Sequence, residues 1–235
     1  MTAPGTLYLI PVPLAADALH TLAPEIIAVL RSTNHFIVEN ARTARRFIKT
    51  TNPPYQIDAL ILTELSKHES NPAEQLLSPL FAGHNVGILS EAGCPGIADP
   101  GSALVQFAHR KGVRVVPLTG TSSLLLALMA SGLNGQRFLF HGYLSPKKDV
   151  LAADLRRLED ISRRDDATQL FIETPYRNTQ VVETALRVLA DSTMFCIAVD
   201  LTSPAEWIQT LEVSAWRKAT VPDLHKRPAV FCLSL

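Results

Sequence analysis

The sequence predicts an α/β protein with two α/β domains. We expect a mostly parallel sheet in the N-terminal domain and a mixed sheet in the C-terminal domain. In the first half, short continuous apolar runs alternate with longer helix-like stretches, as strands buried on both faces of a parallel sheet do. The second half is also rich in strand-like runs but is less regular. Because the pattern changes near Leu118, the predicted domains are residues 1–118 and 119–235.

The first half also carries the signals of crossover helices. Its five predicted strands are Leu7 to Val12, Phe36 to Val38, Leu60 to Leu62, Val86 to Leu89 and Val113 to Leu118. Asn71-Pro72-Ala73-Glu74 combines a capping residue, a proline and a glutamate, which is typical of a helix start. Asp99-Pro100 opens the stretch Gly101 to Lys111 in the same way, and Gly112 is placed to end it. Strand, loop, helix and strand in this order predict right-handed crossover units.

The second half predicts four strands and two long helices. The strands are Phe138 to Leu144, Leu170 to Ile172, Phe195 to Leu201 and Ala229 to Leu233, and the helices are Leu151 to Arg163 and Asn178 to Ala190. No Gly/Ser-rich linker, internal repeat or low-complexity tract marks a boundary between the halves. The division therefore depends on the change of pattern alone.

Composition narrows the function classes. The chain has 235 residues, 47% of them hydrophobic, with 22 basic and 22 acidic side chains. This balance argues against strong non-specific nucleic-acid binding, so an RNA hypothesis must depend on a local site. Three cysteines without Cys-x-x-Cys spacing predict neither a zinc site nor a disulfide framework. With no signal-peptide pattern and no apolar run of membrane-spanning length, we expect a soluble, cytoplasmic protein without a bound metal.

The most informative segment runs from Ser90 to Gly101, between a buried strand and a capped helix. Three glycines and two prolines in twelve residues impose unusual backbone geometry and leave little side-chain bulk. Open α/β sheets bind ligands at the carboxyl ends of their strands. We therefore interpret this loop as a binding site, with a rigid structural turn as the alternative.

A second candidate loop is Thr119-Gly120-Thr121-Ser122-Ser123, which also follows a strand. Its hydroxyl groups suit either a ligand or the N-terminus of the following helix. Motifs for other chemistries are absent from the sequence. It has no G-x-G-x-x-G, no Walker-type G-x-x-x-x-G-K-[ST], no H-E-x-x-H and no G-x-S-x-G. Their absence disfavours dinucleotide binding, nucleotide hydrolysis, zinc proteolysis and serine-hydrolase chemistry.

Several segments resemble a known family. Gly5 to Pro13 resembles the opening strand and loop of bacterial 16S ribosomal RNA 2′-O-ribose methyltransferases, which belong to the tetrapyrrole-methylase superfamily. Ser90 to Gly101 is similar to their Ser-Asp-Ala-Gly-Thr-Pro-Gly-Ile-Ser-Asp-Pro-Gly loop. Further similar segments are Val115 to Ser122, Phe138 to Lys148 and Glu173-Thr174-Pro175-Tyr176-Arg177. The matches follow the family's order over almost the whole chain.

This resemblance implies two α/β domains of the tetrapyrrole-methylase type, usually in a homodimer, with S-adenosylmethionine in the cleft between the domains. Small-subunit rRNA is the implied substrate. The implied cofactor contacts are Pro11, Gly93, Cys94, Pro95, Ile97, Ala98, Ser122 and Ser123, with looser transfers to Glu173 and Ala229. Cys94 stands where the family has threonine, and we interpret it as a packing or cofactor-wall residue, not a nucleophile.

Departures from the family pattern gather on the implied acceptor side. Leu14-Ala15-Ala16-Asp17 replaces Ile-Gly-Asn-Leu, and Glu39-Asn40-Ala41-Arg42 replaces Glu-Asp-Thr-Arg. Glu91 stands where the family has aspartate. The segment Val199 to Ser203 replaces Arg-Glu-Leu-Thr-Lys.

Methylation of a ribose hydroxyl needs an aligned acceptor and a base or hydrogen-bond acceptor beside it. Glu39, at the end of a predicted strand, is the first candidate, and Glu91 is the second. An ion pair from Glu39 to Arg42 or Arg45 is a slightly favoured structural alternative.

Arg42, Arg45 and Arg46 lie with Lys49 near one face of a predicted helix, where they suit RNA phosphates or a solvated surface equally. Lys147 and Lys148 are a possible extension of this patch. His68-Glu69 is a further candidate, although a lone histidine is more often structural.

Two other functions stay open. One is a tetrapyrrole (corrin or precorrin) methylase, which the rRNA-like segments disfavour. The other is a non-catalytic S-adenosylmethionine-binding module, which the changes at Asn40, Ala41 and Ser203 leave open.

Overall fold

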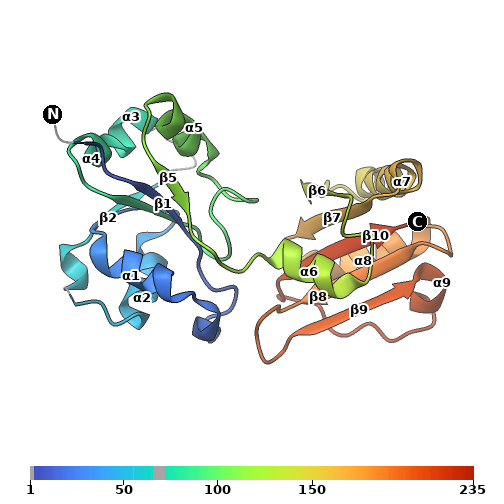
Figure 1. Ribbon diagram of the computed structural model, residues 1–235. Helices are drawn as coiled ribbons and strands as arrows, with labels where there is room; N and C mark the ends of the chain where they lie inside the picture. Colours follow the sequence, from blue (N-terminus) through green and yellow to red (C-terminus); the bar gives the residue numbers. More distant parts are fainter. Residues whose placement is uncertain (1–2, 55, 66–71) are drawn as a thin grey trace. The chain divides into compact units, whose positions relative to one another are not determined.

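The computed structural model describes residues 3–54, 56–65 and 72–235. The chain forms two compact units, residues 1–122 and 123–235. Each has its own five-stranded sheet and its own core (Figure 1). The predicted fold class, an α/β protein with one parallel and one mixed sheet, is confirmed.

The sheet of the first unit is parallel throughout. Its strands are β1 (Leu7–Ile10), β2 (His35–Val38), β3 (Ile61–Glu64), β4 (Val86–Leu89) and β5 (Val115–Pro117). They lie in the order β3-β2-β4-β1-β5, which places β2, β4 and β1 in the interior. All four residues of β4 are buried, as its continuous apolar run predicts. Gly87 in β4 lets the Ile10 and Phe36 side chains approach, since a Cβ there would lie 2.7 and 2.8 Å from them.

Helices cover both faces of this sheet (Figure 1). They are α1 (Pro24–Ser32), α2 (Ala41–Thr50), α3 (Ala73–Leu76), α4 (Ser78–Phe81) and α5 (Ser102–Arg110), with 3-10 turns at Leu19–Thr21 and Ile57–Ala59. One apolar cluster joins the sheet to α1 and α2, and a second joins it to α3, α4 and α5. The sequence patterns did not predict α1, although Pro24 and Glu25 occupy its first turn. Asn71, part of the predicted start of α3, lies outside the described residues.

The sheet of the second unit is mixed. Its strands are β6 (Phe138–Tyr143), β7 (Thr168–Glu173), β8 (Met194–Val199), β9 (Trp207–Glu212) and β10 (Ala229–Ser234), in the order β6-β7-β10-β8-β9. Only the β6–β7 pair is parallel among the pairs of this sheet in the described residues. The sequence patterns did not predict β9, whose residues are mostly half-buried and alternate only weakly.

Helices also pack on both faces of the second sheet. They are α6 (Ser123–Ser131), α7 (Lys148–Asp165), α8 (Asn178–Val188) and α9 (Val213–Trp216). A core of leucine, valine and aromatic side chains joins the sheet to α7, α8 and α9, while α6 packs against β8, β9 and β10. The two long helices predicted from the sequence correspond to α7 and α8.

Candidate functional site

Three loops come together at the carboxyl edge of the first sheet. Residues 11–13 follow β1, residues 90–101 follow β4, and residues 118–122 follow β5. Because β1 lies between β4 and β5, the three loops leave adjacent strands at the same edge. Open parallel sheets usually bind ligands at this edge, at the point where the connections from two adjacent strands pass to opposite faces of the sheet.

Main-chain hydrogen bonds join the first two loops. The Val12 N–H donates to the Gly93 carbonyl at 2.9 Å, and the Gly93 N–H donates back to the Val12 carbonyl at 2.8 Å. The Ser90 hydroxyl also donates to the Gly93 carbonyl at 3.2 Å. These bonds hold the backbone around Gly93 in one conformation.

The third loop packs against the other two. The Cys94 thiol donates to the Thr121 carbonyl at 3.3 Å, and burial raises the pKa of this thiol. A protonated thiol bonded to main chain supports the interpretation of Cys94 as a wall residue. Gly120 lies so close to Pro11 that a Cβ at position 120 would be 2.2 Å from the Pro11 Cβ.

The long loop contains a concentration of left-handed backbone conformations. The φ angles of Gly93, Gly96 and Gly101 are 77°, 80° and 127°, and that of Ala98 is 62°. A non-glycine residue at positive φ costs on the order of 1 kcal/mol or more and persists where surrounding structure imposes it. Such strain is common at ligand sites.

The structure assembles most of the predicted cofactor residues in the first unit. Pro11, Gly93, Cys94, Pro95, Ile97, Ala98 and Ser122 belong to these three loops. The other three belong to the second unit, where Ser123 begins α6 and Glu173 lies opposite Ala229 in the β7–β10 register.

The carboxylate of Glu173 already has partners within the second unit. Its side chain is fully buried, and its Oε2 lies 2.7 Å from Arg177 Nη2, an ion pair without hydrogen-bond alignment. Its Oε1 accepts a hydrogen bond from the Thr174 N–H at 2.6 Å. Arg177 in turn donates to the Ser145 carbonyl at 2.9 Å. Glu173 therefore anchors the conformation that follows β7.

A group of carboxylates lies at the ends of β2, β3 and β4. Glu39 Oε1 accepts a hydrogen bond from the Glu91 N–H at 3.3 Å, and Glu91 Oε1 accepts one from the Thr43 hydroxyl at 2.6 Å. Glu64, at the end of β3, accepts the Ala41 N–H at 2.6 Å. The sequence analysis missed Glu64, whose position at a strand end was the available signal.

Glu39 does not form the ion pair with Arg42 or Arg45 that was the structural alternative. Among the described residues, no ion pair joins Glu39 to Arg42 or Arg45, and its carboxylate instead holds the backbone of Glu91. The two candidate bases are therefore neighbours, one supporting the other.

Asn40, one of the departures from the family pattern, caps helix α2. Its Oδ1 accepts the Arg42 and Thr43 N–H groups, each at 3.0 Å. Asparagine and aspartate are equally good at this position. The change from the family's aspartate therefore keeps the start of α2.

Helix α2 has an exposed basic face and borders a pocket. Arg42, Arg45, Arg46 and Lys49 are all exposed. The pocket, about 300 Å³, is lined by the 12–19 segment, by Glu91 and Ala92, and by α2 residues that include Arg46. A second pocket of about 430 Å³ lies between α5 and the Pro95–Gly101 part of the long loop.

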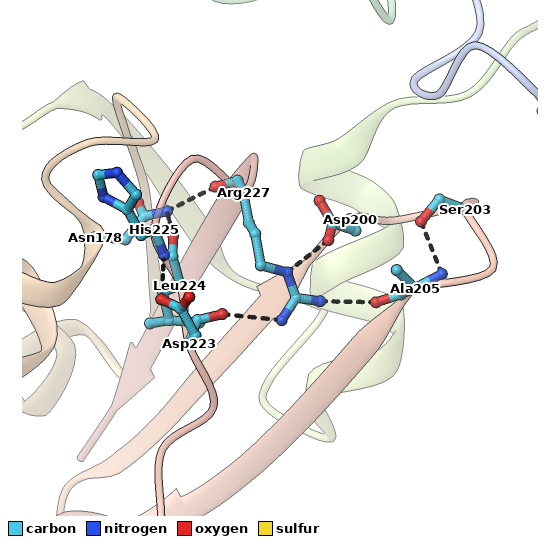
Figure 2. Close-up of polar contacts among 8 residues, drawn as sticks. All are labelled: Asn178, Asp200, Ser203, Ala205, Asp223, Leu224, His225 and Arg227. Atoms are coloured by element: carbon cyan, nitrogen blue, oxygen red, sulfur yellow. Dashed lines mark hydrogen bonds and ion pairs between the residues drawn. The ribbon is translucent and has the colours of Figure 1, made fainter.

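In the second unit, Arg227 fastens the segment that replaces Arg-Glu-Leu-Thr-Lys (Figure 2). Its Nε lies 2.6 Å from Asp200 Oδ2, and it donates to the Ala205 carbonyl at 2.7 Å and to the Asp223 carbonyl at 3.1 Å. The segment includes two non-glycine residues at positive φ, Asp200 at 49° and Thr202 at 69°. Asp200 therefore has a structural partner inside its own unit.

The remaining sequence candidates are two pairs of neighbouring residues. His68 and Glu69 lie outside the described residues. Lys147 and Lys148 are exposed at the start of α7, in the second unit. Among the described helices, none is long and apolar enough to cross a membrane.

Comparison with known proteins gives the family. The sequence profile described as Tetrapyrrole (Corrin/Porphyrin) Methylases matches residues 6–214. The Ribosomal RNA small subunit methyltransferase I of Escherichia coli O157:H7 is 31% identical over 217 residues, which cover 91% of this chain and 72% of that protein. The enzyme of the same name from Xylella fastidiosa (strain Temecula1 / ATCC 700964) is 28% identical, covering 99% of this chain and 82% of the relative.

Solved structures agree on the fold. The methyltransferase CobJ has a TM-score of 0.63 at 20% identity, covering 98% of this chain and 94% of its own. Uroporphyrin-III C-methyl transferase from Thermus thermophilus, solved in complex with S-adenosyl homocysteine, has a TM-score of 0.57 at 18% identity, covering 98% and 97%. At these identities the likeness concerns the fold alone. The profile match and the 31% identical relative together show that this chain belongs to the tetrapyrrole methylase family.

Proposed function

We propose that this protein is an S-adenosylmethionine-dependent methyltransferase that methylates a ribose 2′-hydroxyl of small-subunit rRNA. The observation that carries the proposal is the three-loop site, held by main-chain hydrogen bonds between Val12 and Gly93, in a chain whose relatives are named small-subunit rRNA methyltransferases. We further propose that it acts as a homodimer in the cytoplasm, away from membranes.

The three loops suit a cofactor recognised largely through backbone. Gly96 and Ala98 are exposed, have positive φ and carry little or no side chain, so a ligand can approach the backbone closely at these positions. Pro11, Gly93 to Pro95, Ile97, Ala98 and Ser122 are the proposed contacts within the first unit. Ser123, Glu173 and Ala229 are further contacts that the family resemblance implies. When bound, the cofactor supplies an electrophilic methyl group.

Glu91 is the better supported of the two candidate bases. In the proposed reaction a bond forms between the ribose oxygen and the methyl carbon, the carbon–sulfur bond breaks, and the hydroxyl proton passes to a carboxylate. Glu91 lines a pocket and is oriented by Thr43 at 2.6 Å. Glu39 supports Glu91 through its backbone N–H. We assign Glu91 the acceptor role and Glu39 a positioning role.

The basic face of α2 supports RNA as the substrate. Arg42, Arg45 and Arg46 are exposed on a helix that contains no acidic residue. Within the described part of the chain, none of them takes part in an ion pair. Unpaired arginines on one face are typical of phosphate contacts.

Calorimetric titration with S-adenosylmethionine and S-adenosylhomocysteine tests the cofactor site. We expect dissociation constants in the micromolar range, on the order of −8 kcal/mol. Gly93→Val should abolish binding, because its side chain would fill the loop and a Cβ there already meets Leu14 at 3.3 Å. Gly112→Val is the matched control, since Gly112 has a similar φ of 69° but open space around it, at the end of α5.

Equal affinity in the Gly93→Val and Gly112→Val proteins would contradict the loop assignment. Transfer of a labelled methyl group to small-subunit rRNA then tests the acceptor, with uroporphyrinogen as the tetrapyrrole comparison. Cofactor binding without transfer to either acceptor would favour a non-catalytic binding module.

A further inference from the structure

The pocket beside α2 differs chemically from the three-loop site. Its walls are the 12–19 segment on one side and α2 on the other, with Glu91 and Ala92 between them. Its polar groups come from Thr43, Arg46, Thr50 and Glu91, and its apolar surface includes Leu14 and Phe47. An arginine, a carboxylate and an aromatic ring around one hollow suit a small ligand with an anionic, a hydroxyl-bearing and a planar part.

The charged side chains in and near this pocket differ in their hydrogen-bond and ion-pair partners. The three nearby carboxylates each accept a hydrogen bond from within the first unit: Glu39 from the Glu91 N–H, Glu64 from the Ala41 N–H, and Glu91 from the Thr43 hydroxyl. Arg46 has no ion-pair partner among the described residues. The pocket lining therefore carries one charge of each sign, Arg46 and Glu91, which form no ion pair with each other. One Glu91 oxygen is held in place, and its other oxygen has no hydrogen bond to a described residue.

The size of the pocket limits the ligand. Its volume of about 300 Å³ is at the lower end of the usual range for small-molecule sites, roughly 300–1,000 Å³. It suits one nucleotide and not a stacked or paired segment. Proteins that act on single nucleotides of an RNA commonly unstack them and place them against aromatic and arginine side chains.

We propose that this pocket holds one unstacked nucleotide of the RNA, with Arg46 on its phosphate, Phe47 beside its base and Glu91 accepting a hydrogen bond from its sugar. This inference rests on the proposed function and adds to it a discrete nucleotide site on the first unit. Arg46 has a different role from Arg42 and Arg45, since it alone of the three lines the pocket.

Titration of the full chain with the four nucleoside 5′-monophosphates, followed by nuclear magnetic resonance, tests the pocket. We expect saturable shifts of Thr43, Phe47, Thr50 and Ala16. Arg46→Gln should weaken binding about tenfold, the effect of a lost charge-assisted hydrogen bond. Arg45→Gln removes the same charge from the neighbouring position outside the pocket, so a much smaller loss, about twofold, is expected there.

A second variant makes the test independent of charge. Ala16→Phe adds bulk at an exposed wall position and should prevent nucleotide binding, while cofactor affinity reports that the first unit is still folded. Equal losses in Arg46→Gln and Arg45→Gln would overturn the pocket in favour of diffuse electrostatic attraction. So would binding of inorganic phosphate as tight as that of the nucleotides, or unimpaired binding by Ala16→Phe.

The two proposals fail separately. A protein that binds S-adenosylmethionine but shows no nucleotide shifts keeps the proposed function and loses the pocket. A protein that binds nucleotides at the pocket but no cofactor loses the proposed function, and with it the role of the pocket in methyl transfer.

Discussion

The two units use their charged side chains in opposite ways. In the second unit, arginines pair with carboxylates, and two of these pairs, Arg217–Asp191 and Arg227–Asp200, join segments far apart in the sequence. In the first unit, the carboxylates at the sheet edge are bonded to N–H and hydroxyl groups. The ion pairs found between described residues all lie in the second unit.

This difference separates charge used for structure from charge available to a ligand. A buried pair is costly to break, because the remaining charge is left without a partner. An exposed cation with no partner contributes little to folding and is free to bind phosphate. Breaking a buried pair of the second unit should therefore reduce stability, whereas removing a charge from the α2 face should reduce only binding.

The largest expected effect is that of Glu173→Ala. It leaves Arg177, whose side chain is 23% exposed, without its carboxylate, and it removes the acceptor of the Thr174 N–H. We expect a loss of about 3 kcal/mol in the free energy of unfolding of the second unit. Urea unfolding followed by tryptophan fluorescence measures it, because both tryptophans, Trp207 and Trp216, lie in that unit.

Asp160→Ala is the control for this prediction. It breaks the Arg163–Asp160 pair, whose side chains are 60% and 73% exposed, so the loss should stay within about 0.5 kcal/mol. Similar losses of unfolding free energy in the Glu173→Ala and Asp160→Ala proteins would contradict the distinction between buried and exposed ion pairs.

A smaller effect is expected for Asn40→Ala. The variant loses the acceptor of two N–H groups at the start of α2 and should destabilise the first unit by about 1 kcal/mol. Hydrogen exchange of α2 peptides measures the change, and the tryptophan transition of the second unit should not move. Asn40→Asp should restore protection, and a failure to do so would show that the cap is not the cause.

The smallest effect concerns pH. Burial, and then the neighbouring His84, lower the pKa of His35, so the folded first unit binds fewer protons than the unfolded chain. Its stability should be full above about pH 6.5 and should fall as the pH drops through that value. Scanning calorimetry at several pH values should show the dependence in wild type and weaken it in His35→Gln. A slope unchanged in His35→Gln would contradict this origin.

Much of the fold could be predicted from residue patterns, because a strand buried on both faces appears in the sequence as a continuous apolar run. The predicted strand Val86 to Leu89 has the same bounds as β4 in the structure. Half-buried elements lack such a clear pattern. Strand β9 mixes Trp207 and Ile208 with Gln209 and Thr210 at an edge of its sheet, and no periodicity separates it from a loop.

The candidate site was predictable only where backbone geometry determines it. The glycines of the long loop indicated unusual conformations, and Gly93, Gly96 and Gly101 do have positive φ. Which polar groups meet was not predictable. The Glu39 carboxylate bonds a residue 52 positions away, and Glu91 bonds one 48 positions away. Such pairs depend on strand order, which local sequence does not reveal.

The bridge between Val12 and Gly93 can persist while the sequences of related proteins diverge. Both of its hydrogen bonds join main-chain atoms, so a change of side chain at Val12 leaves them intact. A site assembled in this way tolerates mutational drift, as with the cysteine at position 94 and the alanine at position 98. Relatives 28–31% identical can share its geometry without sharing its side chains, whereas the proposed nucleotide pocket depends on the side chains of Arg46 and Glu91.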